Sequence, residues 1–165
     1  MNKSNENLSS SSFSCLGFQK QYPHCCECNR GKTVTVEENK RKFILDNATA
    51  QQVCRIRIDG CVVDSQTKKC DFLVLVCESK EAYFVELKGK DFISAVEQLT
   101  MTIQSFQRGW EVFPKQGVYA RAVLSQSPPA RAIETDGKVK KLKSLVKSLG
   151  GNFEYGTKQY GNDKA

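Results

Sequence analysis

The chain has 165 residues, of which 39% are apolar and 26% are charged, and this is the size and composition of one ordinary domain with a single core. No stretch reaches the roughly 20 consecutive apolar residues that cross a bilayer, and the N-terminus lacks the basic and then apolar order of a secretory signal. These features exclude an integral membrane protein and predict a cytoplasmic protein without a membrane partner.

The formal charge of +7 lies mostly in the last third of the chain. Residues 107–165 carry eleven basic and five acidic side chains, whereas the residues before them have a surplus of only one positive charge. Lysines and arginines bind polyanions because they release the counterions condensed on phosphates. The charge therefore fits a nucleic-acid partner, and it fits as well a basic surface that only keeps the protein in solution.

Eight cysteines are many for a chain of this length. Disulfide-rich domains are typically short and exported, and this sequence shows no export signal. We therefore expect reduced thiols, with Cys54, Cys61, Cys70 and Cys77 in or beside strands as small apolar side chains.

Four segments are predicted from composition and pattern. Residues 1–14 are mostly Asn, Ser, Lys and Glu, bury too little apolar surface to offset the entropy of ordering, and should form a disordered tail. Residues 15–40 form a cysteine-containing N-terminal segment. Residues 41–155 form the main domain, and residues 156–165 form a frayed C-terminus.

The N-terminal segment offers a weak metal-binding pattern. Cys25 and Cys28 have the spacing of half a zinc site, which Cys15, Cys61 or Cys70 would complete. A structural Zn²⁺ needs four ligands, and no second paired motif is present. Buried or free thiols are therefore favoured over zinc.

The main domain begins with strand-forming runs. Residues 41–46 (RKFILD) fit either a strand or a short helix. Three runs of β-branched and aromatic residues follow, at residues 55–63, 70–77 and 82–88, with short polar connections of the kind that close hairpins. We predict a three-stranded antiparallel meander.

Helical and strand patterns then alternate. Apolar residues recur every third or fourth position over residues 93–106, which predicts an amphipathic helix with Asp91 as its N-cap and Gly109 at its end. Residues 118–124 (VYARAVL) are again typical of a strand. If this strand lies parallel to the last strand of the meander, the helix is a crossover connection. A second helix, with lysines on its solvent side, is expected at residues 139–149.

The meander carries three charged residues at the ends of its strands. Asp71 opens the second strand, and Glu86 and Lys88 close the third. Side chains alternate along a strand, so Glu86 and Lys88 share a face while Leu87 points into the core, and the hairpin brings Asp71 beside them. The two carboxylates and the Leu87 carbonyl offer the hard oxygen ligands that Mg²⁺ or Mn²⁺ prefers. Lys88 would hold or deprotonate an attacking water and offset charge in the transition state.

These residues differ from an ordinary exposed pair, because polar residues of an exposed face alternate along the whole strand. The order Cys70-Asp71 and then Glu86-Leu87-Lys88 resembles the signature of the PD-(D/E)XK nuclease superfamily, with Cys70 in place of the usual proline. The order of elements also resembles the αβββαβ core of this restriction-endonuclease-like fold. The resemblance implies an α/β domain in which helices flank a mixed sheet.

In that family the aspartate and the glutamate bind metal and the lysine acts near the nucleophilic water, so the resemblance assigns these roles to Asp71, Glu86 and Lys88. Several branches also have a glutamine on the following helix, which Gln98 matches. Gln98 would orient Lys88 or a phosphate. An early helical glutamate of the family has no clear counterpart here, so a fourth acid is left unassigned.

Candidate nucleic-acid ligands lie beyond these residues. Lys90 follows the last strand of the meander and would contact a phosphate, although a solvated lysine fits this position as well. The predicted basic helix would hold the phosphate backbone through Lys138, Lys140, Lys141 and Lys143.

The resulting hypothesis is a nuclease that hydrolyses phosphodiester bonds with Mg²⁺ or Mn²⁺ as cofactor, and DNA is favoured over RNA as the substrate. Two alternatives stay open: a nucleic-acid-binding or regulatory subunit that has the same fold without turnover, and an interaction protein stabilised by zinc at the N-terminal cysteines. A homodimer or a larger complex is compatible with the sequence. Because the site residues are predicted to be exposed, their replacement by alanine is expected to leave thermal unfolding nearly unchanged.

Overall fold

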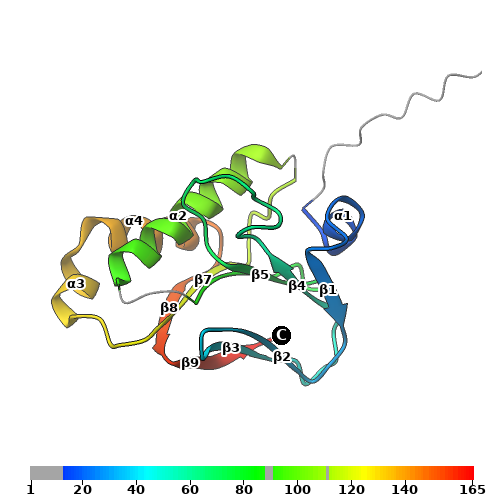
Figure 1. The fold of residues 1–165 in the computed structure, drawn as a ribbon, viewed down its shortest axis with the longest axis horizontal. Helices are drawn as coiled ribbons and strands as arrows, with labels where there is room; N and C mark the ends of the chain where they lie inside the picture. Colours follow the sequence, from blue (N-terminus) through cyan, green and yellow to red (C-terminus); the bar gives the residue numbers. More distant parts are fainter. Residues whose placement is uncertain (1–12, 88–90, 111) are drawn as a thin grey trace, which may run out of the picture.

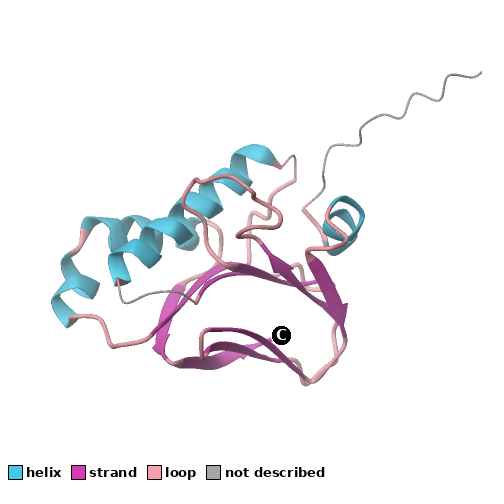
Figure 2. Ribbon diagram, viewed as in Figure 1, coloured by secondary structure: helices cyan, strands magenta, loops and turns pink. Residues whose placement is uncertain are grey.

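The structure is a computed structural model that describes residues 13–87, 91–110 and 112–165. Within these residues, four helices and nine strands follow one another along the chain (Figures 1 and 2). The helices are α1 (Cys15–Gln21), α2 (Phe92–Gly109), α3 (Ala130–Thr135) and α4 (Gly137–Ser148). The strands are β1 (Cys26–Asn29), β2 (Thr33–Glu38), β3 (Arg41–Asp46), β4 (Val53–Arg57), β5 (Phe72–Val76), β6 (Ala82–Glu86), β7 (Val118–Leu124), β8 (Phe153–Thr157) and β9 (Gln159–Lys164).

The described strands form one mixed sheet in the order β1-β4-β5-β6-β7-β8-β9-β3-β2. β4, β5 and β6 form the predicted antiparallel meander, in which Val53 pairs with Val76 and Phe72 pairs with Val85. The chain then passes through α2 to β7, which lies parallel to β6. The prediction of an α/β protein with a mixed sheet is confirmed.

The elements after the meander lie close to their predicted positions. α2 begins after Asp91, whose side chain accepts a hydrogen bond from the Ser94 N–H at 3.1 Å, and it ends at Gly109. The predicted strand at residues 118–124 is β7. The predicted second helix is α4, which begins two residues earlier than expected and is preceded by the short α3.

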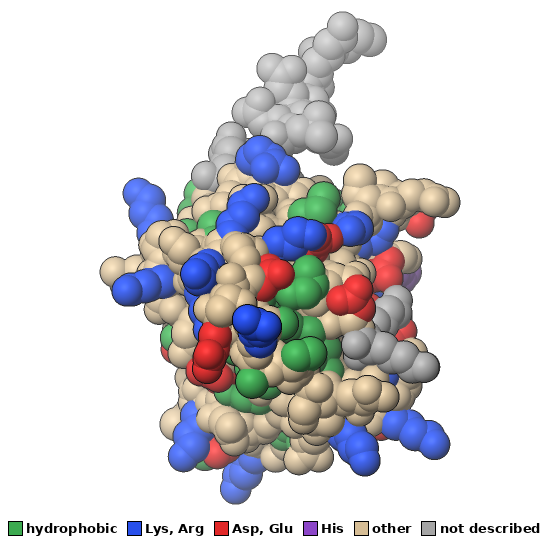
Figure 3. Space-filling view, turned by 90° about the vertical axis from the view of Figure 1, so that its left-hand side faces the viewer, with side chains coloured by type: hydrophobic (Ala, Val, Ile, Leu, Met, Phe, Trp, Pro, Cys, Tyr) green, Lys and Arg blue, Asp and Glu red, His purple; other side chains and the backbone are tan. Residues whose placement is uncertain are grey.

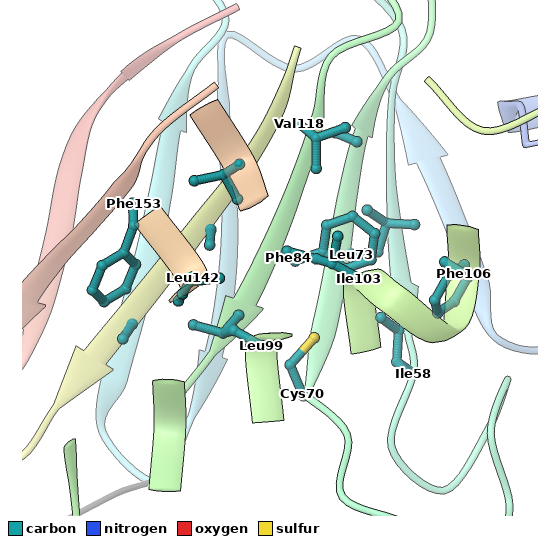
Figure 4. Close-up of a cluster of buried hydrophobic side chains, with 14 of the residues drawn as sticks. Ile58, Cys70, Leu73, Phe84, Leu99, Ile103, Phe106, Val118, Leu142 and Phe153 are labelled. Carbon is teal, nitrogen blue, oxygen red and sulfur yellow. The ribbon is translucent and has the colours of Figure 1, made fainter. Parts of the chain in front are cut away.

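Two cores lie on the two faces of the main sheet. α2 and α4 cover one face and enclose apolar side chains that include Leu73 and Phe84 (Figures 2 and 4). The other face is covered by β2, β3 and β9, the far part of the same sheet, which curls beneath the first part (Figure 1). Apolar residues of β2 and β3, such as Val36 and Phe43, supply this second core. The predicted sheet flanked by helices is therefore correct for one face only.

Residues 15–40 are not a separate segment, because β1 pairs with β4 and β2 pairs with β3 in the main sheet. Residues 41–46, for which a strand and a short helix were both open, form the strand β3. The sheet thus begins well before the boundary that composition indicated.

The predicted C-terminal boundary of the disordered tail, residue 14, is too late in the sequence. Phe13 is buried against a cluster of aromatic rings that includes Phe18, and the Ser14 hydroxyl accepts a hydrogen bond from the Gly17 N–H at the start of α1. The rest of the predicted tail, residues 1–12, lies outside the described residues.

The predicted fraying of residues 156–165 is wrong, because β9 pairs with β3 in the parallel direction. Arg121 on β7, which is 1% exposed, donates from Nε and Nη2 to the two carboxylate oxygens of Asp163 on β9 at 2.6 and 2.8 Å. Three tyrosine rings surround the guanidinium group: Tyr83, Tyr119 and Tyr160. A buried ion pair therefore holds a strand whose own sequence is mostly polar.

The expectation of reduced thiols is wrong for six of the eight cysteines, which form the disulfides Cys15–Cys77, Cys25–Cys61 and Cys28–Cys54. Cys26 and Cys70 have free thiols. The partners are 26 to 62 residues apart in the sequence, so only the fold brings them together.

Two observations bear on the surroundings of the protein. No helix in the described ranges is long and apolar enough to cross a membrane. Disulfides are typical of oxidising compartments, so the three pairs in the structure do not support the predicted cytoplasmic location.

Candidate active site

The meander brings Asp71 and Glu86 to neighbouring positions. Asp71 immediately precedes β5, Glu86 is the last residue of β6, and the pairing of Phe72 with Val85 places the two acids opposite each other. Side chains alternate along strands, and the residues of the same parity in β5 and β6 point into the core beneath the helices. Asp71 and Glu86 therefore share the face that α2 covers.

Both acids are buried rather than exposed. Asp71 is 2% exposed and Glu86 is 0% exposed. Asp71 Oδ2 accepts a hydrogen bond from the Leu87 backbone N–H at 2.8 Å, which fixes this carboxylate against the end of β6. The expectation of an exposed site is wrong, because β5 and β6 are central strands with both faces covered.

The free thiol of Cys70 lies within the electric field of both acids. Burial raises its pKa well above the ordinary value, and the negative charges of Glu86 and then Asp71 raise it further. On the neighbouring helix, the Thr102 hydroxyl accepts a hydrogen bond from the Cys70 N–H at 2.8 Å. Figure 4 shows the Cys70 side chain among apolar side chains of the sheet and of α2. The carboxylates of Asp71 and Glu86 therefore lie beside a cluster of apolar side chains from which water is largely excluded.

Arg41 is a residue of this site that sequence analysis missed. Its Nε donates a hydrogen bond to the Leu87 carbonyl oxygen, which is the carbonyl predicted to bind metal. A carbonyl oxygen has two lone pairs, so it can accept this bond and still face a cation. Arg41 and Leu87 are 46 residues apart, and no local pattern indicates their contact.

The remaining predicted catalytic residues are placed less completely. Lys88 and Lys90 lie outside the described residues. Gln98 is a partly exposed residue of α2, and its backbone carbonyl accepts a hydrogen bond from the Thr102 hydroxyl at 2.7 Å. Thr102 contacts the backbone of Cys70, just before β5. Gln98 precedes Thr102 by four residues, which is one helical turn, so it lies on the same side of α2 as Thr102.

The lysines of the predicted basic helix, now α4, differ in their surroundings. Lys138 donates a hydrogen bond to Glu97 on α2, and Lys68, from the loop before Asp71, donates another. These bonds lower the pKa of Glu97 to about 2. All four predicted lysines of this helix are exposed: Lys138, Lys140, Lys141 and Lys143. Figure 3 shows one face of the molecule, on which basic, acidic and apolar side chains are interspersed.

Cys25 and Cys28, which have the spacing of half a zinc site, have different disulfide partners. Cys25 is bonded to Cys61 and Cys28 is bonded to Cys54. Within the described residues, the sulfur clusters of a size that fits a metal ion include Cys28 but not Cys25.

The donor atoms around Asp71 suit a small, hard cation. Two carboxylates from adjacent strands and the carbonyl of Leu87, the residue that follows Glu86, are oxygen ligands of the kind that Mg²⁺ and Mn²⁺ bind. The residues present therefore offer donor atoms of the type that the predicted ion prefers.

Comparisons of the chain with protein-family models, with curated proteins and with solved structures found no match.

Proposed function

We propose that the protein is a divalent-metal-dependent nuclease with an active site around Asp71, Glu86 and Lys88. The observation that carries the proposal is the burial of two carboxylates at neighbouring positions of adjacent strands, with Asp71 held by the Leu87 N–H. Acidic side chains are almost never fully buried unless they are paired or coordinate a metal, and neighbouring buried acids are concentrated at functional sites.

The energetic reason lies in desolvation and repulsion. Burial disfavours the charged form of a carboxylate, and a second carboxylate nearby disfavours it further. A divalent cation offsets both effects at once, because it brings two positive charges into a small volume lined by oxygen atoms. The neighbouring positions of Asp71 and Glu86 therefore support the proposal of a site for such an ion.

Each residue has a role in the proposed reaction. Asp71 and Glu86 would hold Mg²⁺ or Mn²⁺ together with the Leu87 carbonyl. Such an ion, when bound, lowers the pKa of a coordinated water and offsets charge on the phosphate. Lys88 would hold or deprotonate the attacking water, and Gln98 would orient Lys88 or a phosphate. DNA is the favoured substrate class.

The order of elements supports the finer proposal of a restriction-endonuclease-like core. The antiparallel strands β4, β5 and β6, the crossover helix α2 and the parallel strand β7 follow the βββαβ part of that core. Two features depart from the expected pattern: β1, β2 and β3 separate α1 from the meander, and strands rather than a helix cover the second face.

Two features favour the alternative of a nucleic-acid-binding or regulatory module without turnover. The carboxylates are covered, and Arg41 already occupies one lone pair of the Leu87 carbonyl. A binding module with this structure would retain affinity for nucleic acid while showing no cleavage with any divalent ion.

The decisive experiment is a cleavage assay on single-stranded, duplex and branched DNA and on RNA, with Mg²⁺, Mn²⁺ or EDTA. We expect cutting by the wild type that requires the metal. Asp71→Asn, Glu86→Gln and Lys88→Gln should each lower the rate by about 100-fold or more, because each removes a charge that acts in the transition state. The matched controls Glu134→Gln and Lys115→Gln remove exposed charges and should cut like the wild type.

Mn²⁺ binding tests the site without knowledge of the substrate. Titration calorimetry should detect Mn²⁺ binding by the wild type and by Glu134→Gln, and much weaker binding by Asp71→Asn and Glu86→Gln. Wild-type affinity in both site variants would contradict the assignment of the ligands. Metal binding without any cleavage of the four substrate forms would favour the binding module.

A further inference from the structure

Five cysteines from distant parts of the sequence meet at one end of the sheet. Cys15 opens α1, Cys54 lies in β4, and Cys77 follows the last residue of β5. Cys26 and Cys28 lie two residues apart in β1, the strand that pairs with β4. Asp71 precedes β5 and Cys77 follows it, so the cysteines and the carboxylates lie at opposite ends of that strand.

The sulfur atoms of these cysteines form a continuous chain. Cys15 is bonded to Cys77, and Cys28 is bonded to Cys54. The Sγ atoms of Cys54 and Cys77, which belong to different disulfides, are 3.7 Å apart, and the Sγ atoms of Cys26 and Cys28 are 3.6 Å apart. The sulfurs of Cys15, Cys54 and Cys77 all lie within 4.8 Å of one another.

These separations match those of a metal-thiolate site. Four sulfurs at about 2.3 Å from a tetrahedral Zn²⁺ stand roughly 3.8 Å apart. The Cys54–Cys77 separation of 3.7 Å already has this value. Reduction would free the bonded sulfurs, and side-chain rotation would then move the two sulfurs of each pair apart.

We propose that Cys15, Cys28, Cys54 and Cys77 bind one Zn²⁺ ion when their two disulfides are reduced. Cys15, Cys54 and Cys77 form the compact triad, and Cys28 is the fourth ligand because its sulfur lies directly against that of Cys54. Cys26 and Cys28 form a second such group with Cys54. Of these two, Cys28 is assigned as the ligand because it is bonded to Cys54, whereas Cys26 forms no disulfide. Thiolates are soft ligands, which favour zinc over the hard ions proposed for Asp71 and Glu86.

Reduction of the two disulfides followed by zinc binding requires only a dithiol as the reductant. Each disulfide takes up two electrons and two protons from one dithiol, which leaves as its own disulfide. The four thiols then release four protons to solvent as their thiolates bind the ion. A sulfur in a disulfide has no thiolate to offer, so the oxidised and the zinc-bound forms exclude each other.

The site is structural rather than catalytic. Four protein ligands complete a tetrahedral sphere and leave no position for water or substrate. Cys54 and Cys15 are buried and Cys28 and Cys77 are partly buried, so none of the four ligands is fully exposed to solvent. The ligands come from α1, β1, β4 and the turn after β5, so zinc would replace the disulfides as the cross-link between α1 and this end of the sheet.

Cobalt substitution of the full chain tests the proposal, because tetrahedral Co²⁺-thiolate sites have intense, specific absorption bands. We expect the chain reduced with a phosphine to bind one Co²⁺ with these bands and to release it when Zn²⁺ is added. The oxidised chain should show no bands, and Zn²⁺ should raise the Tm of the reduced chain. Absence of the bands in the reduced wild type would overturn the proposal.

Cys28 and Cys26 form a matched pair for the assignment of ligands, because they lie two residues apart in one strand and are both partly buried. Cys28→Ser should lower the affinity for Co²⁺ by more than about 100-fold, whereas Cys26→Ser should bind like the wild type. Equal loss in both variants, or greater loss in Cys26→Ser, would overturn the ligand set.

A rescue variant separates loss of a ligand from loss of folding. Cys28→His should restore binding and shift the bands to those of a site with three sulfurs and one nitrogen, whereas unchanged bands would count against Cys28 as a ligand. Cys61→Ser, which removes the disulfide outside the cluster, should retain the cobalt spectrum of the wild type. The readouts are spectroscopic, so they are independent of whether the chain is a nuclease.

Discussion

Asp71 combines two roles, because its carboxylate is a proposed metal ligand and also the acceptor for a buried backbone N–H. A charged surface residue would have only the first role. Burial also means that replacement by alanine tests folding together with chemistry, and for this reason the cleavage assay uses amide variants of the same shape.

We predict that Asp71→Ala lowers the free energy of unfolding by about 1–3 kcal/mol, because the Leu87 N–H would lose its partner in a site closed to water. Urea denaturation measures the change. Asp64→Ala, at an exposed loop position, should stay within about 0.5 kcal/mol of the wild type. Equal stability of both variants would show that the bond contributes nothing.

Arg121 and Asp163 are the residues that hold the last strand in place. The guanidinium group is buried and donates to both oxygens of the carboxylate. Removal of one partner from a buried ion pair costs more than the pair contributes, because the other charge remains without compensation.

We predict that Asp163→Asn lowers the free energy of unfolding by about 3–5 kcal/mol. Guanidinium denaturation checks the value. Glu154→Gln, an exposed acid on the neighbouring strand β8, serves as the control and should change stability by less than about 0.5 kcal/mol. A loss in Asp163→Asn as small as in the control would mean that β9 does not depend on the ion pair.

At the scale of elements, α2 is connected to its neighbours by Glu97. This side chain accepts hydrogen bonds from Lys138 on α4 and from Lys68 in the loop that leads to Asp71. These two hydrogen bonds join α2 both to α4 and to the loop that precedes Asp71.

The pH dependence of this link follows from the pKa of Glu97, which the bonds from Lys138 and then Lys68 lower from 4.5 to about 2. A carboxyl group with a lowered pKa stabilises the folded state above its unfolded pKa and loses this effect as pH falls toward its folded pKa. We therefore predict that the Tm difference between the wild type and Glu97→Gln is full above pH 4.5 and disappears between pH 4.5 and 2.

Thermal unfolding at several pH values measures this difference, with Glu134→Gln as an exposed control that should follow the wild type at every pH. High salt should reduce the difference, because the ion pairs lie near the surface. A difference that persists unchanged at pH 2 would contradict the predicted link.

At the scale of the whole molecule, the uneven charge bears on the proposed substrate. Lys140, Lys141 and Lys143 are exposed on α4, in the helical layer that covers the face of Asp71 and Glu86. We predict that the double variant Lys140→Gln/Lys143→Gln weakens DNA binding and lowers the slope of log K against log salt by roughly 1.8, at about 0.9 per lost phosphate contact.

Fluorescence anisotropy at several salt concentrations measures this slope. The double variant Lys115→Gln/Lys164→Gln removes two exposed lysines away from α4 and should keep the wild-type slope. Equal slopes for both double variants would indicate that α4 makes no specific contribution to binding.

The sequence by itself determined the elements with strong local periodicity. The apolar, β-branched and aromatic runs of β5 and β6, the helical repeat of α2 with Asp91 as its cap, and the run that became β7 were all predicted close to their observed positions. The neighbouring positions of Asp71 and Glu86 followed from the hairpin, because a short connection sets which residues stand opposite each other.

Only the tertiary structure decided the features that depend on distant residues. β1 and β9 are short and largely polar, and they form because β4 and β3 offer free edges and because Arg121 attracts Asp163. The cysteine pairs and the contact of Arg41 with Leu87 join positions that are 26 to 62 residues apart. Local patterns report the environment of each residue, whereas burial and long-range pairing depend on how the whole chain packs.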